Sequence, residues 1–382
     1  MGRRAERRLW SPDEPGRLEV LTGRGRPLRV ADVALFYGER SGGIRTYLRE
    51  KAAYAVRCGA FEHHVVVPGR VERHEDGWHE LRALRVAASN GYRIPLGVGA
   101  LRASLRSIEP DVVLLHDPFW APLGVAETAH ELGARVIAVH HGSGELNAAG
   151  VPGPMRIYLP AFRAWMRHAY ARADGVMSVV DPRRDSGRPA SMVLRFGVDA
   201  AFRPRPALPR RPHVLYAGRL GREKGVFELL EAAARSREPW RVHLVGSGPA
   251  ERVLAARARR LAIADRVLFL PWVPDRPRLA RLYAEASCVA MPGAHETFGL
   301  VALEAAASGA NVVACTTAPS AALLGGVAEI FAPGDTRGLL AAIERARRRP
   351  PDLRAAAELA AAHTWERAFE DELRVLERMC AQ

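Results

Sequence analysis

Short apolar runs alternate with helical patterns along most of the chain, which is the rhythm of strands and helices in a doubly wound parallel sheet. In the first half we expect strands at 28–37, 63–68, 111–116, 135–140, 175–180 and 192–196. In the second half we expect strands near 213–217, 241–246, 266–271, 287–292 and 310–315. No repeat of solenoid length accompanies this pattern. The predicted fold class is therefore α/β.

A proline-rich segment divides the pattern in two. Residues 203–212 hold four prolines and show no periodicity, as expected of a linker. At 382 residues the chain is also long for a single core. The predicted parts are a basic N-terminal extension, a first domain, the linker, a second domain and a last helix, at 1–27, 28–203, 204–212, 213–364 and 365–382.

One segment, which predicts a buried strand, a turn and an apolar helix, carries two carboxylates. Residues 287–292 predict the strand, and Glu296 lies in the glycine-bearing turn that follows. Glu304 is the one charged residue of the next, apolar helix. A buried carboxylate is costly unless hydrogen bonds satisfy it, and a sugar or ribose diol donates two. We therefore expect Glu304 to bind a hydroxyl pair; the apolar neighbours disfavour the alternative of a solvated helix face.

The same segment predicts an anion site at a helix N-terminus. The backbone N–H groups of Phe298, Gly299 and Leu300 fall in the first turn, where they have no intrahelical partner. Such N–H groups suit a phosphate or a developing negative charge.

Two further strand–turn–helix units lie upstream. The strand 213–217 ends at Gly218, and the following loop holds Arg219 and Lys224, the kinds of cation expected around a diphosphate. Two basic residues in a loop are also common on a solvated surface. The strand 241–246 ends in another tight glycine turn at Gly246, and this third unit favours the diphosphate interpretation.

These motifs, in this order, resemble those of the family 4 glycosyltransferases, which are retaining, nucleotide-sugar-dependent enzymes of GT-B fold. In the second half the resemblance rests on the diphosphate-binding pattern at 218–225, the G-x-G-P turn at 246–249 and the E-x7-E pair of Glu296 and Glu304. In the first half it rests on the elements at 41–44, 116–118 and 196–199, where Phe196 departs from the usual Asn or Tyr.

The resemblance implies two Rossmann-like domains that face each other across an interdomain cleft, the first for the acceptor and the second for the donor. Arg219 and Lys224 would neutralise the diphosphate, Glu304 would bind the ribose and Glu296 the donor sugar. The leaving phosphate would take the acceptor proton, so His116 would orient the sugar or polarise a hydroxyl and would not be an obligatory base. The catalytic candidates are thus Glu296, His116, Arg219 and Lys224. The donor-binding candidates are Gly42, Gly43, Gly218, Arg219, Lys224, Gly246, Glu296, Phe298, Gly299, Leu300 and Glu304.

No resident cofactor is expected, because the nucleotide sugar would be a co-substrate. No bound metal is expected either. No spaced Cys/His set is present, and the Asp-x-Asp motif of the other major glycosyltransferase fold is absent. His140 and His141 follow the strand 135–140, and with Phe119 and Trp120 they would line an acceptor pocket. Loop packing is an equal alternative for these four residues.

The net charge of +14 suggests an anionic partner or a biased genome, since Arg is abundant and Lys scarce. An anionic membrane surface is one partner, with the segment 3–10 as its contact; a solvated tail is the alternative. No apolar run long enough to cross a membrane and no secretory signal is present. Four scattered cysteines suit a reduced compartment. We expect a cytoplasmic protein, with the inner face of the plasma membrane as a further location.

Three function classes follow from the sequence. The first is a retaining, metal-independent hexosyltransferase that passes a sugar from GDP-mannose or a UDP-hexose to a lipid or glycan acceptor. The second is a related nucleotide-sugar epimerase or sugar phosphorylase. The third is a non-catalytic basic module for membrane or nucleic acid, although the chain lacks a basic helix or aromatic strand motif for nucleic acid. The sequence favours the first class and leaves the sugar, base and acceptor open.

Overall fold

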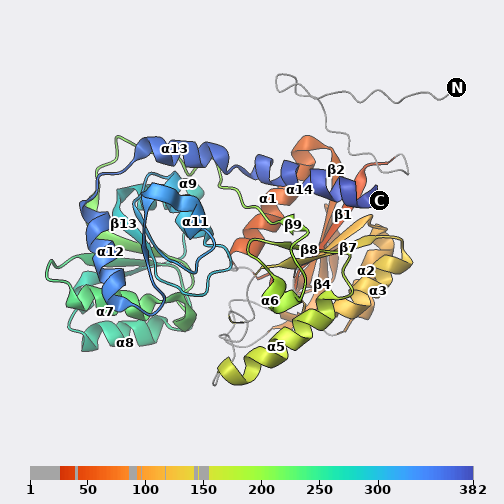
Figure 1. Ribbon diagram of the computed structural model, residues 1–382, viewed down its shortest axis with the longest axis horizontal. Coiled ribbons are helices and arrows are strands. Elements are labelled where there is room, and N and C mark those ends of the chain that lie inside the picture. The colour runs from red at the N-terminus through yellow and green to blue at the C-terminus, as the bar shows by residue number, and fades with distance from the viewer. Residues whose placement is uncertain are drawn as a thin grey trace.

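The computed structural model describes residues 26–38, 42–85, 93–95, 97–116, 118–141, 145 and 155–381. The predicted basic extension lies outside the described residues except for its last two. Two β-sheets, each flanked by helices, form two halves of the molecule (Figure 1). The predicted α/β class is confirmed.

The first sheet has nine described strands in the order β3-β4-β2-β1-β6-β7-β8-β9, with β5 paired to β4. Their bounds are β1 Leu28–Val33, β2 Phe61–Gly69, β3 Arg73–Glu75, β4 Trp78–Arg85, β5 Arg93–Pro95, β6 Val112–Leu115, β7 Arg135–His140, β8 Gly175–Ser178 and β9 Met192–Val193. β1 runs parallel to β2 and β6, so that Val30 pairs with both His63 and Val112. β3 and β5 run antiparallel to β4 at the edge of the sheet.

The second sheet has six parallel strands in the order β12-β11-β10-β13-β14-β15. Their bounds are β10 Arg211–Ala217, β11 Arg241–Val245, β12 Val267–Leu270, β13 Ala286–Met291, β14 Val312–Cys315 and β15 Ala328–Phe331. The chain order along this sheet reverses between β10 and β13, and ligands of open α/β sheets bind at such a switch point, beyond the carboxyl ends of the strands.

The helices connect successive strands and continue to the C-terminus. In the first half they are α1 Gly43–Cys58, α2 Gly99–Ile108, α3 Pro122–Glu131, α5 Met155–Tyr170 and α6 Arg183–Ser186. In the second half they are α7 Val226–Arg235, α8 Glu251–Arg260, α9 Arg276–Glu285, α10 Leu300–Ala307, α11 Ala321–Leu324, α12 Thr336–Arg348, α13 Leu353–Ala362 and α14 Trp365–Cys380.

The burial of the strands explains why apolar runs in the sequence predicted their positions. Every residue of β6, β8, β13 and β14 is buried, as expected of strands covered on both faces. Each of the eleven expected strands overlaps an observed one. β3, β4, β5 and β15 were not expected, because they are short or mix charged with apolar positions.

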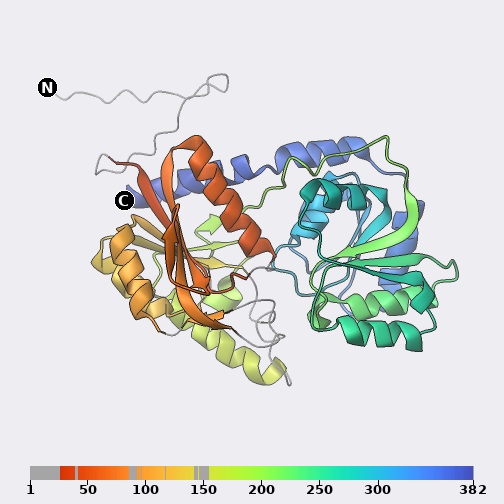
Figure 2. The ribbon, with the colours of Figure 1, turned by 180° about the vertical axis from the view of Figure 1, so that it is seen from behind.

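Two chain segments cross between the halves side by side. The N–H of Val198 donates to the carbonyl of His363 at 2.8 Å, and Val198 pairs with Thr364 in a parallel bridge. Gly197 has no room for a side chain, because a Cβ there would lie 2.2 Å from the backbone N of Trp365. α14 then runs back along α1 of the first half (Figures 1 and 2).

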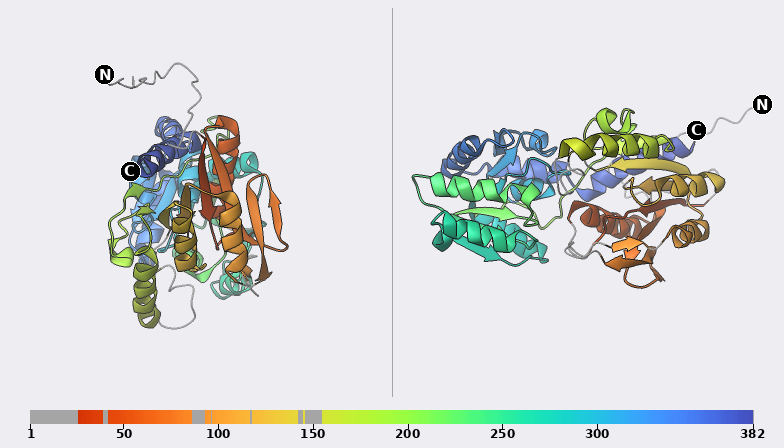
Figure 3. Two further views of the ribbon diagram at one scale, coloured as in Figure 1. Left: turned by 90° about the vertical axis from the view of Figure 1, so that its right-hand side faces the viewer. Right: turned by 90° about the horizontal axis from the view of Figure 1, so that it is seen from below.

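Apolar side chains also join the halves. Phe196 stacks on Phe298 with a centroid distance of 4.5 Å. Both rings belong to a core that includes buried residues of β1, β13 and α14. The view from below shows the two halves next to each other (Figure 3). The junction is thus packed where the two crossing segments meet.

Candidate active site

Two glycine turns at the carboxyl ends of β10 and β11 pack backbone against backbone. A Cβ at Gly246 would lie 2.0 Å from the carbonyl oxygen of Gly218, and both residues have a positive φ, 149° at Gly218 and 136° at Gly246. A Cβ at Gly248 would likewise lie 2.4 Å from the carbonyl oxygen of Leu220. Glycine is therefore required for close approach, and the two predicted turns form one backbone surface.

Lys224 and Glu296, which the sequence assigned to two separate motifs, form an ion pair. Lys224 ends a short 3-10 helix, Arg222–Lys224. The following Gly225 has φ 68°, and a Cβ there would lie 2.5 Å from the carbonyl oxygen of Pro292. This contact holds the lysine loop against the turn after β13, so Lys224 Nζ lies 2.9 Å from Glu296 Oε2.

Arg219 lies in the same loop but has a different partner. Its guanidinium reaches Glu223 Oε1 at 3.2 Å, and the Arg219 side chain is 38% exposed, which leaves it accessible to an anion. Its carbonyl oxygen accepts a hydrogen bond from the buried Tyr216 hydroxyl at 2.7 Å. Burial raises the pKa of Tyr216 well above its usual value, so the hydroxyl stays protonated as a donor. Tyr216 thus fixes the backbone from which Arg219 extends.

Two helix N-termini meet at the junction between the halves. Gly299, with φ 90°, is the N-cap of α10, and Gly42 is the N-cap of α1. Neither helix receives a side-chain cap. A Cβ at Gly43 would lie 3.4 Å from Leu300 Cδ1. Two sets of uncapped N–H groups and two positive dipole ends therefore lie near each other, which favours an anion between them.

Phe298 supports the start of α10. Its carbonyl oxygen accepts the N–H of Ser320 at 2.9 Å, and its ring packs on Phe196. The backbone at Phe298, Gly299 and Leu300 is therefore held from both halves of the molecule.

Glu304 lies inside α10 and is buried, as its apolar neighbours predict. The hydroxyl of Tyr283 on α9 donates to Glu304 Oε2 at 3.4 Å, and Arg276 Nη1 lies 3.8 Å from Oε1. Burial raises the pKa of Glu304 from 4.5 to about 7, and the nearby Arg276 cation and Tyr283 hydroxyl limit the rise. A buried carboxylate with so few donors suits two ligand hydroxyls.

Arg276, which the sequence did not single out, links both halves. Its Nη2 lies 3.1 Å from Glu50 Oε1 of α1, and its Nε lies 3.8 Å from Asp199 Oδ2 of the crossing segment. The guanidinium also lies over the ring of Phe202 at 5.9 Å. One arginine at the start of α9 thus ties Glu304 to α1.

His116 is buried at the carboxyl end of β6 and uses both ring nitrogens inside the protein. Its Nε2 lies 2.5 Å from Asp32 Oδ1, and its Nδ1 lies 2.6 Å from His141 Nε2. Asp32 Oδ2 also pairs with Lys51 at 2.8 Å. His63 Nε2 lies 2.5 Å from the same Oδ2. Burial opposes the charge on Asp32, yet Lys51 and the hydrogen bonds from His116 and His63 hold its pKa well below the usual value. The donor-site role of His116 stays a prediction.

The buried network continues to the C-terminal helix. Lys51 Nζ lies 2.6 Å from Glu372 Oε1 of α14, and the Tyr47 hydroxyl donates to Glu372 Oε2. Lys51 and Lys224 are the two lysines of the chain. Lys51 pairs with Asp32 and Glu372, and Lys224 pairs with Glu296. A charged residue inside the apolar strand 28–37 was the one sequence signal for Asp32.

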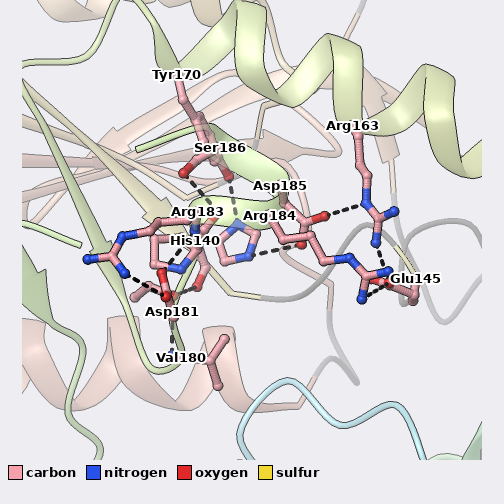
Figure 4. A network of polar contacts seen from close by, with 12 residues as sticks. His140, Glu145, Arg163, Tyr170, Val180, Asp181, Arg183, Arg184, Asp185 and Ser186 are labelled. Carbon is pink, nitrogen blue, oxygen red and sulfur yellow. Dashed lines mark hydrogen bonds and ion pairs between the residues drawn. The ribbon is translucent and has the colours of Figure 1, made fainter. Parts of the chain in front are cut away.

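His140 and His141 point to opposite sides of the end of β7. His140 lies among α5 and α6, where Asp185 Oδ2 is 3.7 Å from its Nε2 and the Tyr170 hydroxyl is 3.5 Å from its Nδ1 (Figure 4). The same network joins Arg163 to Asp185 and Glu145. His141 stacks on His116 instead, with centroids 4.8 Å apart. Burial lowers the pKa of His141 well below its usual value, so this ring is neutral near pH 7.

A cavity of about 410 Å³ lies beyond the ends of β11 and β12. Gly246, Ser247, Leu270 and Trp272 contribute to its lining, and it therefore adjoins the paired glycine turns. The indole of Trp272 is 47% exposed, so a planar ring could stack on it. Among the described residues, no group of His, Cys, Asp or Glu side chains is arranged to hold a metal ion.

Comparisons with known proteins agree with this geometry. A family model for glycosyl transferases group 1 matches residues 211–348, and one for glycosyltransferase family 4 matches residues 41–186. A GDP-mannose-dependent alpha-(1-6)-phosphatidylinositol dimannoside mannosyltransferase of Mycobacterium tuberculosis is 30% identical over 316 residues, 76% of this chain and 80% of that protein. A GDP-mannose-dependent alpha-mannosyltransferase of the same species is 30% identical over 349 residues, 85% and 86% of the two chains.

Solved structures show the same arrangement of two sheets. Sucrose-phosphate synthase from Thermosynechococcus elongatus superposes with a TM-score of 0.73 at 19% identity, covering 93% of this chain and 99% of that one. The fold is GT-B, as predicted. The chain belongs to the family 4, group 1 glycosyltransferases. It is therefore a glycosyltransferase of the nucleotide-sugar-dependent kind that its motifs resemble.

Proposed function

We propose that the protein is a retaining mannosyltransferase that moves mannose from GDP-mannose to a lipid-linked acceptor without a divalent metal. The observation that carries the proposal is the meeting of the α1 and α10 N-termini beside the Lys224–Glu296 pair. This arrangement offers two dipole ends, one ammonium group and the exposed guanidinium of Arg219 to a diphosphate. Two relatives that cover most of this chain are GDP-mannose-dependent, which supports the choice of donor.

Each part of the donor has a proposed partner. The diphosphate lies between Lys224, Arg219 and the N–H groups at Gly42–Gly43 and Phe298–Leu300. The ribose diol donates to Glu304, and the guanine occupies the cavity beside Trp272. Glu296, held by Lys224 at 2.9 Å, accepts hydrogen bonds from the mannose hydroxyls.

The proposed transfer keeps the anomeric configuration. The acceptor oxygen bonds to the anomeric carbon on the face from which the β-phosphate leaves, and the acceptor proton passes to the departing phosphate oxygen. The products are the α-mannoside and GDP. Lys224, Arg219 and the two helix N-termini stabilise the negative charge that develops on the phosphate. Glu296 is engaged by Lys224 and Glu304 is assigned to the ribose, so neither is proposed as a nucleophile.

Product analysis tests this proposal. The protein is incubated with GDP-mannose or UDP-glucose, membrane lipids and a chelator, and products are separated and examined by NMR. We expect transfer from GDP-mannose to give an α-mannosyl lipid with the chelator present. A β-linked product would contradict retention, and loss of activity in the chelator would contradict metal independence. An epimerised nucleotide sugar or a free sugar phosphate would indicate a different GT-B activity.

The proposal extends to location. Among the described residues, no helix combines the length and apolar character needed to cross a bilayer. We propose that a lipid acceptor is reached from the membrane surface, and the net charge of +14 favours an anionic surface.

A further inference from the structure

One carboxylate and two histidines form a buried, hydrogen-bonded triad in the first half. Asp32 belongs to β1, His116 follows β6 and His141 follows β7. His116 Nε2 lies 2.5 Å from Asp32 Oδ1, and His116 Nδ1 lies 2.6 Å from His141 Nε2. Because β1, β6 and β7 are neighbouring parallel strands, the triad lies toward the carboxyl edge of the sheet.

The charge on Asp32 sets the direction of these hydrogen bonds. Although burial opposes the charge, Asp32 is ionised near pH 7, because its pKa lies well below the usual value. An ionised carboxylate only accepts hydrogen bonds, so His116 must carry a proton on Nε2. When His116 is neutral, its Nδ1 is then a lone pair that accepts the Nε2–H of His141. Asp32 thus determines which nitrogen of His141 carries the proton.

One nitrogen of the triad has no partner in the part of the chain that the structure describes. This atom is His141 Nδ1, which is buried, and the whole residue is 8% exposed. Since His141 carries its proton on Nε2, Nδ1 is a hydrogen-bond acceptor. A buried acceptor without a donor is costly, so a ligand hydroxyl would be stabilised there. Direct contact of His116 with a substrate would instead require one of its two hydrogen bonds to break.

The triad lies close to the residues proposed to bind the donor. The ring of Tyr47 on α1 lies 5.6 Å from that of His116 and 5.9 Å from that of Phe196. Phe196 in turn packs on Phe298, directly before α10. Tyr47 is one turn beyond Gly43, at the start of α1. Ring contacts therefore connect the triad with both helix N-termini of the candidate site.

We infer that Asp32 is a positioning residue of the transfer reaction. Through His116 it fixes the tautomer of His141, so that His141 Nδ1 accepts a hydrogen bond from a substrate hydroxyl. This hydroxyl belongs to the transferred sugar or to the acceptor, and it is not the attacking one, whose proton passes to the leaving phosphate. The inference rests on the proposed function in that it concerns substrates bound at the same site. It adds the group that orients them.

Asp32→Asn should reverse the tautomers without changing the size of the side chain. Lys51 Nζ and His63 Nε2 both lie on Asp32 Oδ2, at 2.8 and 2.5 Å, so the amide oxygen should take this place. The amide N–H group then faces His116 Nε2, which becomes the acceptor. His116 must carry its proton on Nδ1, and His141 likewise, so that His141 Nδ1 becomes a donor. The same substitution imposes the wrong histidine tautomer in a Ser-His-Asp triad.

NMR of protein labelled with ¹⁵N-histidine reads these tautomers without any substrate. We expect His141 to carry its proton on Nε2 in the wild type and on Nδ1 in Asp32→Asn. The signals of His141 are identified by their absence from the spectrum of His141→Asn. A wild-type His141 with its proton on Nδ1, or the same tautomer in both proteins, would overturn the inference.

Transfer measurements at pH 8 test the consequence for the reaction. We expect Asp32→Asn to lower kcat/KM about 10- to 100-fold, because one hydrogen bond to a substrate hydroxyl is lost, and to leave GDP affinity unchanged. His63→Gln is the matched control, since His63 contacts the same carboxylate and glutamine also supplies an N–H group. It should transfer sugar at the wild-type rate. Equal losses in His63→Gln and Asp32→Asn would show that Asp32 has only a structural role.

Substitutions of His141 test the acceptor atom, even if Asp32→Asn does not fold. His141→Asn keeps an amide oxygen near the position of Nδ1, whereas His141→Phe has a ring without an acceptor. We expect His141→Asn to retain clearly more transfer activity than His141→Phe. Equal activities of the two variants would contradict a role for Nδ1.

Deoxy analogues of the nucleotide sugar identify the source of the hydroxyl. If the hydroxyl belongs to the transferred sugar, one analogue should give equal kcat/KM in the wild type and Asp32→Asn. If the difference persists with every analogue, the hydroxyl belongs to the acceptor.

The outcome can be separated from that of the proposed function. The variants are compared with whichever nucleotide sugar the wild type transfers, so a wild type that uses another sugar would refute only the proposed donor. A wild type that transfers mannose, together with an Asp32→Asn variant of equal kcat/KM, would overturn the role of Asp32 alone.

Discussion

Replacing Glu304 with Gln should stabilise the ligand-free protein and weaken the binding of its donor. Burial raises the pKa of Glu304 from 4.5 to about 7. A carboxyl whose pKa is raised by folding contributes stability below its unfolded pKa and loses that contribution as the pH rises through its folded pKa. Here the loss falls between pH 4.5 and about 7, and it amounts to about 3 kcal/mol.

Glu304→Gln keeps the shape of the side chain and removes the charge. We therefore expect it to raise the free energy of unfolding by up to about 3 kcal/mol at pH 8 and by less than about 1 kcal/mol at pH 5. Arg276 keeps its contacts with Glu50 and Asp199, which limits the loss from the missing charge. Urea unfolding followed by tryptophan fluorescence gives both values.

Donor binding should change in the opposite direction. The amide replaces a charged acceptor of two ribose hydroxyls, and hydrogen bonds to charged groups contribute about 1.5–3 kcal/mol each. We expect at least tenfold weaker GDP-mannose binding at pH 8. In the wild type, affinity should fall about tenfold from pH 8 to pH 6 as Glu304 takes up a proton, and the Gln variant should lack this dependence.

A matched control is Glu296→Gln, which removes a carboxylate from the same region. Glu296 is held by Lys224 at 2.9 Å, so its replacement should not stabilise the protein at pH 8. The reasoning would be refuted if Glu304→Gln lowered stability at pH 8, or if it bound GDP-mannose with the wild-type affinity and pH dependence.

Three other tests, each with its own substitutions, examine separate parts of the structure. Lys224→Ala should weaken GDP binding and turnover together, whereas Glu296→Ala should leave GDP affinity nearly intact and remove turnover. Equal losses of GDP affinity in the two variants, measured by calorimetry, would refute these separate roles. Glu372→Ala leaves a buried lysine without one partner and should cost about 3–5 kcal/mol in urea unfolding; an unchanged midpoint would contradict the importance of the network. Gly246→Ala, whose Cβ would meet a carbonyl oxygen at 2.0 Å, should lower Tm and donor affinity, whereas Gly326→Ala, with nothing within 4 Å, should change neither.

The parts of the site that sequence reasoning found are those encoded within one strand–turn–helix unit. The turns at Gly218 and Gly246 and the start of α10 at Gly299 depend on local backbone geometry, which glycine reveals. The burial of Glu304 followed from its apolar neighbours along one helix. Such local patterns predict a shared site because the parallel sheet brings successive turns to one edge.

The parts that were missed depend on contacts between distant segments. Arg276 is one arginine among many in the chain, and only the fold brings it to Glu304, Glu50 and Asp199. The buried link from Asp32 through Lys51 to α14 likewise joins residues from opposite ends of the chain. No periodicity or spacing encodes such pairs, so the sequence could not predict them.

The central claim is that the two glycine-capped helix N-termini and Lys224 bind the diphosphate of a nucleotide sugar. Calorimetric titration of the wild type and Lys224→Ala with GDP-mannose, UDP-glucose and ADP-glucose, without divalent metal, tests it most directly. The account predicts tight binding of GDP-mannose that is lost in Lys224→Ala. Binding of none of the three by a folded wild-type protein, or equal binding by Lys224→Ala, would contradict it.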